Sequence, residues 1–420
     1  MSDWTTNSNE ALQLSLVRAP KDKELLEDEN EYEGFQPTFT YPIFGEDEKV
    51  YGYQDLVIDL RLASGSLVQY LSISSSSKLT GKAASTVDDV EGTLYKFIPP
   101  DYLKNESEFL TRVERDAGTF RPIGTKIYSY KQIHHPKSAS SQLIMEPPTQ
   151  ADEENNDVIV YEVYHATWDT PGFREYHRRM QIFILLYIEG GSYIQEDEET
   201  WEFVVLYEKR KRRDGPKTPT YHFVGYSTLF PFYCFPEMVR MRLSQFVILP
   251  PYQRLGHGSA LYTAIYQYVL DQSRIAELTV EDPAEAFEDL RDRNDLRMLL
   301  HHKQFICEGF GAEPLNGMII KTSKGKLGPP AEKGWVEKWR RDLKIAGRQF
   351  SRLIEMLILK HLSPHDAKAM RAFRLQVKER LYRFNYEILA QLEKQERLEK
   401  LEETFQSVKE DYQRILAMVR

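Results

Sequence analysis

The stretch SQFVILPPYQRLGHG, residues Ser244–Gly258, decides the fold. Its apolar beginning, taken with the residues just before it, predicts a strand over Arg240–Leu249 that two prolines end. The loop Gln253–Gly258 follows and contains two glycines. Apolar residues then recur at helical spacing, namely Leu261, Ile265, Tyr268 and Leu270. We therefore expect a strand, a glycine-containing loop and a helix in direct succession.

Such a loop suits a phosphate group. Glycines let the backbone approach a ligand closely, and the start of a helix offers unpaired N–H groups and the positive end of its dipole. The loop is not a Walker motif, because no Gly-Lys-Ser/Thr follows it, and it lacks the third glycine of a dinucleotide fingerprint. An ordinary tight turn between a strand and a helix stays open as the alternative.

The elements on either side predict an α+β fold with a mixed sheet. We expect a buried strand over Gln181–Glu189, a hairpin of Trp201–Lys209 and Tyr221–Leu229 with a basic tip, and a strand over Ile275–Val280. A helix is expected from Asp282 onward. Strands that alternate with helices after an antiparallel run indicate one α+β domain.

The length of 420 residues predicts more than one domain. We place an N-terminal mixed α/β domain at 1–150, with a short helix in its first 30 residues, and a catalytic domain at 151–312. A C-terminal helical region is placed at 313–420, where apolar residues follow helical spacing. A helical bundle or interaction module is the expectation there.

Composition limits the class of protein. Two cysteines, no hydrophobic leader and no run of 18 apolar residues predict a soluble intracellular protein without disulfides or membrane spans. The net charge is −9, and residues 1–60 carry 14 acidic and 4 basic residues. Such a surface attracts basic partners and repels nucleic acid, although many acidic proteins share it.

The loop and its neighbours resemble a known family. Gln253-x-x-Gly256-x-Gly258 matches the signature of the GNAT superfamily of N-acetyltransferases. The whole stretch Ser244–Gly258, together with Val280–Pro283 and Phe44–Glu48, resembles the catalytic subunits of type B histone acetyltransferases, in a fungal-type form. The resemblance runs from about residue 35 to about residue 310 and implies a mixed-sheet GNAT acetyltransferase core.

The resemblance implies acetyl-CoA as the cosubstrate and no metal. It places the pantetheine arm along the end of the strand and the pyrophosphate on the loop, and it adds one aromatic contact. The residues that it implies for the cofactor are Ile248, Leu249, Pro250, Leu255, Gly256, His257, Gly258, Ser259, Ala260, Leu261 and Phe287.

Glu281 is the predicted general base. It follows the strand Ile275–Val280, at the edge of an α/β sheet where ligands bind. Lysine has a reference pKa near 10.4, so a carboxylate that accepts its proton is useful at neutral pH. Asp282 is a second candidate, although Asp282–Glu285 also reads as a capping box. The resemblance also implies a catalytic carboxylate at Glu189.

For the substrate, the resemblance implies the N-terminal tail of free, newly made histone H4, with a role in chromatin assembly. It places Glu46, Asp47, Glu48, Trp201, Phe232, Tyr233 and Cys234 along the substrate path. A solvated acidic turn, a core tryptophan and an ordinary strand are the structural alternatives for these residues. The implied partners are histone H4 with H3 and a WD40-repeat histone-binding subunit, in cytoplasm and nucleus.

Two other functions stay open: a GNAT enzyme with a different amine substrate, and a catalytically silent histone-binding scaffold. No direct nucleic-acid partner is expected. The pairs His134-His135 and His301-His302 lack companions at metal-ligand spacing, so no metal site is predicted.

Overall fold

The protein is represented by a computed structural model, in which the described residues are 4–26, 28–133, 142–155, 157–212, 218–315, 318–321 and 325–419. They form two compact units. The first comprises 1–231 and 242–265, and the second comprises 232–241 and 266–420. The division into domains at 1–150, 151–312 and 313–420 stays a prediction, because a compact unit need not coincide with a domain.

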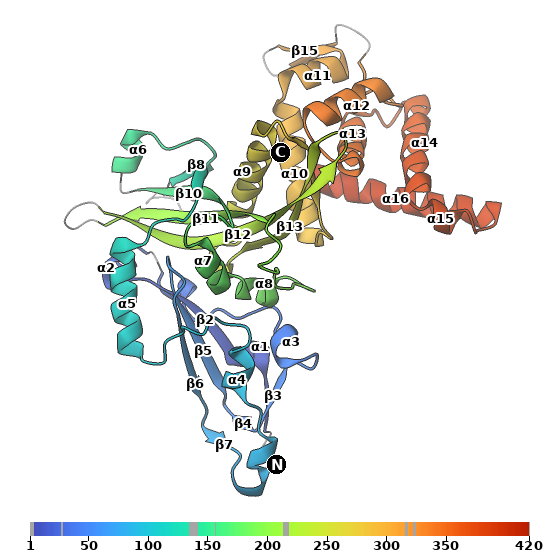
Figure 1. Ribbon diagram of the computed structural model, residues 1–420. Helices are drawn as coiled ribbons and strands as arrows, with labels where there is room; N and C mark the ends of the chain where they lie inside the picture. The colour runs from blue at the N-terminus through green and yellow to red at the C-terminus, as the bar shows by residue number, and fades with distance from the viewer. Residues whose placement is uncertain are drawn as a thin grey trace. The chain divides into compact units, whose positions relative to one another are not determined.

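The N-terminal part of the first unit is built on a three-stranded sheet (Figure 1). Strand β2 (Leu12–Val17) runs parallel to β5 (Val57–Ala63), which is antiparallel to β6 (Gln69–Ser74). Helix α5 (Glu106–Thr119) packs on it through Phe109 and Val113, in a core with Val17, Ala63 and Tyr70. Short helices do lie within the first 30 residues, at α1 (Ser8–Ala11) and α2 (Pro20–Lys23). Between them Leu12–Val17 forms a buried strand, with leucines at alternate positions.

Short elements complete this part. Two small sheets pair β1 (Thr5–Asn7) with β3 (Lys49–Tyr51), and β4 (Tyr53–Gln54) with β7 (Ser77–Lys78). The helical turns are α1 (Ser8–Ala11), α2 (Pro20–Lys23), η1 (Asn30–Tyr32), α3 (Tyr41–Phe44), η2 (Gly81–Thr86) and α4 (Val90–Leu94).

The larger sheet of the first unit contains neighbouring strands in the order β13, β12, β11, β10, β8 and β9. Their bounds are β8 (Thr125–Ile133), β9 (Gln142–Ile144), β10 (Val158–Thr167), β11 (Glu202–Lys211), β12 (Pro219–Cys234) and β13 (Met238–Ile248). Pairing of β10 with β11 and of β11 with β12 is antiparallel, which confirms the predicted hairpin. Helix α6 (Gln150–Glu154) precedes β10.

The predicted strand over Gln181–Glu189 is wrong. Helix α7 (Phe173–Met180) is followed directly by helix α8 (Ile182–Tyr187), and all residues from Ile182 to Leu186 are buried. A short apolar run does not distinguish a buried strand from a buried helix, because neither leaves a polar face in the sequence. Glu189 therefore follows a helix rather than a strand.

The decisive stretch folds as expected. Strand β13 is followed by a 3₁₀ turn, η3 (Pro250–Tyr252), then the loop, then helix α9 (His257–Asp271). The first unit contains the loop and the beginning of α9, and the second unit contains the end of this helix. The structure confirms an α+β fold with a mixed sheet.

The second unit begins around β14 (Ile275–Val280), whose bounds agree with the prediction. Helix α10 (Glu285–His301) starts three residues later than expected. Ala284 is its N-cap and makes no side-chain capping bond, so the capping box at Asp282 is wrong. Asp282 has φ of 31° instead, and Pro283 after it disfavours the helical conformation at that position.

Helices form the remainder of the second unit, as predicted for the C-terminal region (Figure 1). Their bounds are α11 (Lys303–Phe310), α12 (Lys333–Asp342), α13 (Gly347–His361), α14 (Ala367–Phe384), α15 (Tyr386–Leu389) and α16 (Lys394–Met418), with the small strands β15 (Ala312–Leu315) and β16 (Met318–Lys321). Helix α13 contacts α10, α14 and α16. Among the described residues, no helix combines the length and apolar character that crossing a membrane requires.

Candidate functional site

The loop Gln253–Gly256 contains two residues with left-handed backbone angles. Arg254 has φ of 62° and Gly256 has φ of 94°, both in the left-handed region. A Cβ on Gly256 would meet nothing closer than Leu143 at 3.7 Å, so the backbone angle and not space explains the glycine.

Helix α9 starts directly after Gly256. The N–H of Ala260 donates to the carbonyl of Gly256 at 3.1 Å, so it is used inside the helix. The N–H groups of His257 and Gly258 lie in the first turn, where helix geometry provides no acceptor. Ala260 and Leu261 are fully buried and contribute packing. Of the residues predicted to donate an N–H group to the phosphate, those before Ala260 therefore remain candidates.

The strand end before the loop is already hydrogen-bonded within the protein. Leu249 N–H donates to Val224 at 3.0 Å, and the carbonyl of Ile248 accepts from Gln253 Nε2 at 2.8 Å. Pro250 has no N–H, and its carbonyl accepts from the N–H of Gln253 at 3.1 Å. A pantetheine arm along this segment would use the second lone pair of a carbonyl or apolar contact with these residues.

The side chain of His257 points into the protein interior. It is fully buried, and its Nδ1 lies 2.8 Å from the hydroxyl of Tyr130. Burial lowers the pKa of His257 to about 4, so the ring is neutral at physiological pH. The predicted role of His257 in binding therefore belongs to its backbone.

Glu281, Asp282 and Phe287 belong to the second unit. Glu281 directly follows β14 and is half-buried, while Asp282 is exposed. Phe287, in the first turn of α10, is half-buried. Because Asp282 does not cap α10, both Glu281 and Asp282 remain candidates for proton transfer.

The strand that precedes Glu281 is held by ion pairs and backbone bonds. Glu277 accepts from Arg240 at 2.6 Å and from Arg340 at 2.8 Å. Leu278 N–H donates to the carbonyl of Lys344 at 2.8 Å. The carboxyl end of β14 is thus fixed only three residues before Glu281.

The acidic turn of the first unit divides into two kinds of residue. The Glu48 carboxylate accepts from the N–H of Thr40 at 2.8 Å, the N–H of Tyr41 at 3.2 Å and Asn9 Nδ2 at 2.6 Å. The backbone bond from Thr40, with the bonds from Asn9 and Tyr41, lowers the pKa of Glu48. Glu48 therefore fixes the local chain.

Glu46 and Asp47 are exposed, so their charges face solvent. The chain next to the exposed Glu189 is fastened to the same segment, because Gly190 N–H donates to the Tyr41 hydroxyl at 2.6 Å. Tyr41 N–H in turn donates to Glu48. The structure thus brings Glu189 and the acidic turn into one connected region.

Trp201 is largely buried, at 9% exposure. Its Nε1 donates to Glu198 at 2.7 Å, and its ring packs edge-on against Phe230 at 4.8 Å. Most of the Trp201 side chain packs in the interior, in agreement with the alternative of a core tryptophan. A small part of it remains accessible to a ligand.

The tip of the β12–β13 hairpin belongs to the second unit and exposes aromatic rings. Phe232 is 37% exposed and Tyr233 is 74% exposed, and the half-buried Cys234 is a free cysteine. Phe235, 83% exposed, was not predicted. Phe235 directly follows Phe232–Cys234, which were predicted to lie along the substrate path, and this position next to them was the available sequence signal.

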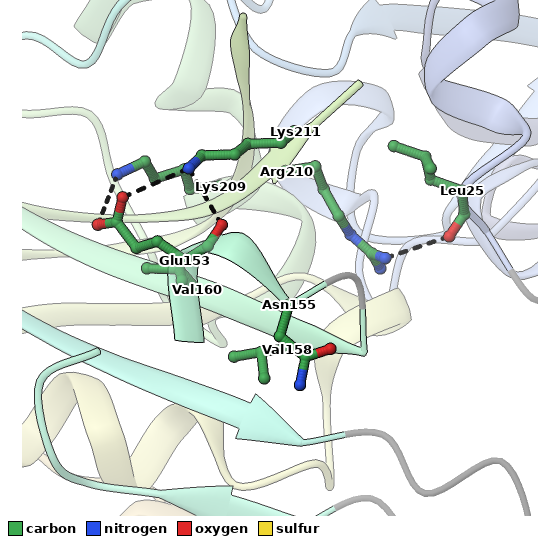
Figure 2. A pocket seen from close by; sticks show the side chains of 8 residues that line it. All are labelled: Leu25, Glu153, Asn155, Val158, Val160, Lys209, Arg210 and Lys211. Carbon is green, nitrogen blue, oxygen red and sulfur yellow. Dashed lines mark hydrogen bonds and ion pairs between the residues drawn. The ribbon is translucent and has the colours of Figure 1, made fainter. Parts of the chain in front are cut away.

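A separate polar pocket lies elsewhere in the first unit (Figure 2). Lys209 pairs with Glu162 at 3.0 Å, Lys211 donates to the carbonyl of Glu153 at 3.0 Å, and Arg210 donates to the carbonyl of Leu25 at 3.1 Å. This pocket contains none of the predicted site residues. Three cations of the basic run are therefore used to hold the fold.

Metal ligands are not gathered in the part of the chain that the structure describes: no group of three or more His, Cys, Asp or Glu side chains is found there. His134 and His135 lie outside the described residues, as does Arg213 at the basic tip.

Comparison with known proteins adds the family. A family model described as histone acetyl transferase HAT1 N-terminus matches residues 4–189, and one described as fungal HAT1, C-terminal, matches residues 292–363. One solved structure, an aminoglycoside acetyltransferase from an uncultured soil metagenomic sample, covers 32% of this chain and 86% of its own at 14% identity. Its TM-score is 0.24.

Relatives named histone acetyltransferase type B catalytic subunit match along the chain. The protein of Cryptococcus neoformans var. neoformans is 53% identical and covers 100% of this chain and 98% of its own length. That of Mycosarcoma maydis is 45% identical, with 97% and 87% covered, and that of Candida albicans is 35% identical, with 98% and 90% covered. The chain therefore belongs to the family of type B histone acetyltransferase catalytic subunits, which makes it an acetyltransferase and implies acetyl-CoA as its acetyl donor.

Proposed function

We propose that this enzyme acetylates lysines in the N-terminal tail of free, newly made histone H4, and that it thereby takes part in chromatin assembly. The observation that carries the proposal is the connected acidic region of the first unit, where Glu46, Asp47 and Glu189 are exposed. A flexible basic peptide fits such a surface by charge, and the electrostatic attraction raises its rate of association.

The chemistry requires a neutral amine. With a reference pKa near 10.4, only about one lysine in 2,500 is neutral at pH 7. We assign Glu281 as the general base that takes the proton as the amine attacks the acetyl carbonyl. The C–S bond then breaks and coenzyme A departs as a thiolate, which solvent can protonate because thiols have a pKa near 8.5. Glu189 and Asp282 are assigned supporting roles in positioning the amine or passing its proton to solvent.

The cofactor assignment rests on the loop. Its left-handed backbone at Arg254 and Gly256, followed by the first-turn N–H groups of His257 and Gly258, fits a pyrophosphate. Leu255, 46% exposed, and the half-buried Ser259 complete the proposed cradle. Phe287 is assigned an apolar contact with the same cosubstrate.

The proposal extends to partners and location. A WD40-repeat subunit that holds histones H4 and H3 would supply the substrate, in the cytoplasm and in the nucleus. No direct binding of nucleic acid or membrane is proposed, since the net charge of −9 disfavours the anionic surfaces of both.

Substrate choice is tested by mass spectrometry of acetylation on free H4, an H4-tail peptide, spermidine and peptides with free N-termini. We expect H4 and its peptide to be modified at the highest kcat/KM. Preference for spermidine would identify an enzyme with another amine substrate, and no turnover on any amine would identify a scaffold.

The acidic region is tested by the double variant E46Q/D47N. We expect KM for the H4 peptide to rise about three- to tenfold at low salt, with less effect at high salt, because two exposed charges are removed. The matched control is D157N/D169N, which removes two other exposed acidic charges of the same unit. Equal KM changes in the two double variants would contradict a local role of the acidic turn.

A further inference from the structure

The loop Gln253–Gly256 is held at both of its ends by buried side chains. Tyr252 precedes it and His257 follows it, and both are buried. Each of these side chains makes its polar contact with a strand far away in the sequence, on the sheet of the first unit. This loop needs such support, because the left-handed conformation of Arg254, a residue other than glycine, costs conformational free energy that the surroundings must offset.

The first end is fixed by a buried ionic cluster. The hydroxyl of Tyr252 donates to Glu208 Oε2 at 2.7 Å and accepts from Arg18 Nη2 at 2.8 Å. Arg18 and Glu208 themselves pair at 2.8 Å with almost no exposure. This end has several polar contacts, so the loss of one of them leaves others in place.

At the second end, the described part of the chain gives the His257 side chain a single polar contact. His257 Nδ1 bonds the hydroxyl of Tyr130, while Nε2 is buried and has no partner among the described residues. Whichever nitrogen carries the proton, one polar atom of the ring is paired and the other is not. The bond to Tyr130 is therefore the polar contact that complements the aromatic packing around this ring.

The surroundings of the ring provide a natural control. The rings of Tyr130 and Tyr161 stack on each other at 5.0 Å, and both lie against His257, at 6.0 and 4.4 Å between ring centroids. The hydroxyl of Tyr161 bonds Gln132 Oε1 at 2.9 Å. Two buried tyrosines on neighbouring strands therefore contact one histidine, and of the hydroxyl groups in the described residues that of Tyr130 bonds it.

We propose that Tyr130, through its hydrogen bond to His257, is a positioning residue for the acetyl-CoA loop. The bond fixes the first residue of α9, and with it the direction of the N–H groups of His257 and Gly258 toward the cosubstrate. Preorganised donors bind an anion more tightly because no ordering is needed on binding. The inference rests on the proposed use of acetyl-CoA at this loop and adds a residue from β8 to it.

The test compares Y130F with Y161F in the full-length protein. Both changes remove one buried hydroxyl and keep the ring, so we expect similar decreases in melting temperature. Only Y130F is expected to weaken acetyl-CoA binding, about fivefold in Kd by isothermal titration calorimetry, which corresponds to one ordinary hydrogen bond. In steady-state assays KM for acetyl-CoA should rise while kcat at saturation stays within about twofold of wild type.

Two results would overturn the inference: an unchanged Kd in Y130F, or equal weakening in Y130F and Y161F. Failure of the wild-type protein to bind acetyl-CoA would instead refute the proposed function, so the two failures are distinguishable.

If Y130F does not fold, the pair H257N and H257L replaces it. An asparagine amide lies close to the position of Nδ1 and keeps a partner for Tyr130, whereas leucine does not. We expect H257L to bind acetyl-CoA more weakly than H257N does. Equal affinities in these two variants would also overturn the inference.

Discussion

His177 shows at the residue scale how burial alone changes chemistry. It is 1% exposed, surrounded by Trp168, Phe173 and Phe203, and neither ring nitrogen has a partner among the described residues. Burial lowers the pKa of His177 to about 3. The ring behaves as an apolar side chain, and it is neutral at physiological pH.

This pKa makes stability depend on pH. Between pH 6.5 and about 3 the unfolded chain binds a proton at His177 and the folded chain does not, so stability falls as pH is lowered through this window. Above pH 6.5 the contribution is constant. Burial also lowers the pKa of His257 and of His222, which act in the same direction.

The variant H177L tests this effect. Between pH 6.5 and 4.5, the free energy of unfolding should fall less steeply with decreasing pH in H177L than in the wild type. The slope should be smaller by about 1.4 kcal/mol per pH unit, because one proton is no longer taken up on unfolding. Urea unfolding at several pH values measures it. H365L, at an exposed histidine, is the control and should keep the wild-type slope. An unchanged slope in H177L would show that His177 is not buried in this way.

At the scale of elements, the sequence predictions are confirmed where the apolar pattern agrees with the residues that end an element. Ile275–Val280 was predicted to the residue, and the stretch Ser244–Gly258 forms the expected strand, loop and helix start. They failed at α8, where a fully buried run carries no periodicity, and at Asp282, where the backbone left the helical region before Pro283. Local sequence does not reveal which face the neighbouring elements will cover.

The site was predictable only in part for the same reason. The loop and Glu281 carry local signals, but Tyr130 and His257 are separated by 127 positions and meet only in the folded sheet. Similarly, Glu48 has the same charge as Glu46, and only the structure shows that its carboxylate is bonded to the segment at Thr40.

Lys344 joins the C-terminal helices to helix α9 within the second unit. Its Nζ donates to the carbonyls of Val269 at 3.0 Å, Leu270 at 3.0 Å and Gln272 at 2.7 Å. These lie at the carboxyl end of α9, where a cation also interacts favourably with the helix dipole. Burial lowers the pKa of Lys344, in spite of its contacts.

We expect K344M to reduce the free energy of unfolding by about 2 kcal/mol, because three carbonyls lose a charged donor. Urea unfolding followed by tryptophan fluorescence measures the change. The control K333M removes a lysine whose side chain is 83% exposed and whose carboxylate partner, Glu379, is 3.5 Å away, and it should change stability by less than about 0.5 kcal/mol. Equal midpoints for K344M and wild type would contradict a capping role.

At the scale of the whole molecule, the candidate residues are distributed over two units. The loop and the acidic region belong to the first, and Glu281 belongs to the second. Each set is supported from within its own unit, by Tyr130 and the ionic cluster at Arg18 in one, and by Arg340 and Lys344 in the other. The C-terminal helices thus help to hold the strand that ends at the proposed base.

The central claim is that Glu281 is the base of a lysine acetyltransferase. The most direct measurement is kcat of E281Q on an H4-tail peptide at pH 7 and at pH 10, with E285Q, an exposed glutamate at the start of α10, as the control. We predict a loss of about 100-fold or more for E281Q at pH 7, partial recovery at pH 10 where roughly a quarter of the lysine is already neutral, and near wild-type turnover for E285Q. Turnover of E281Q within about threefold of wild type at pH 7 would contradict the account, since a contribution from general base catalysis is about 100-fold or more.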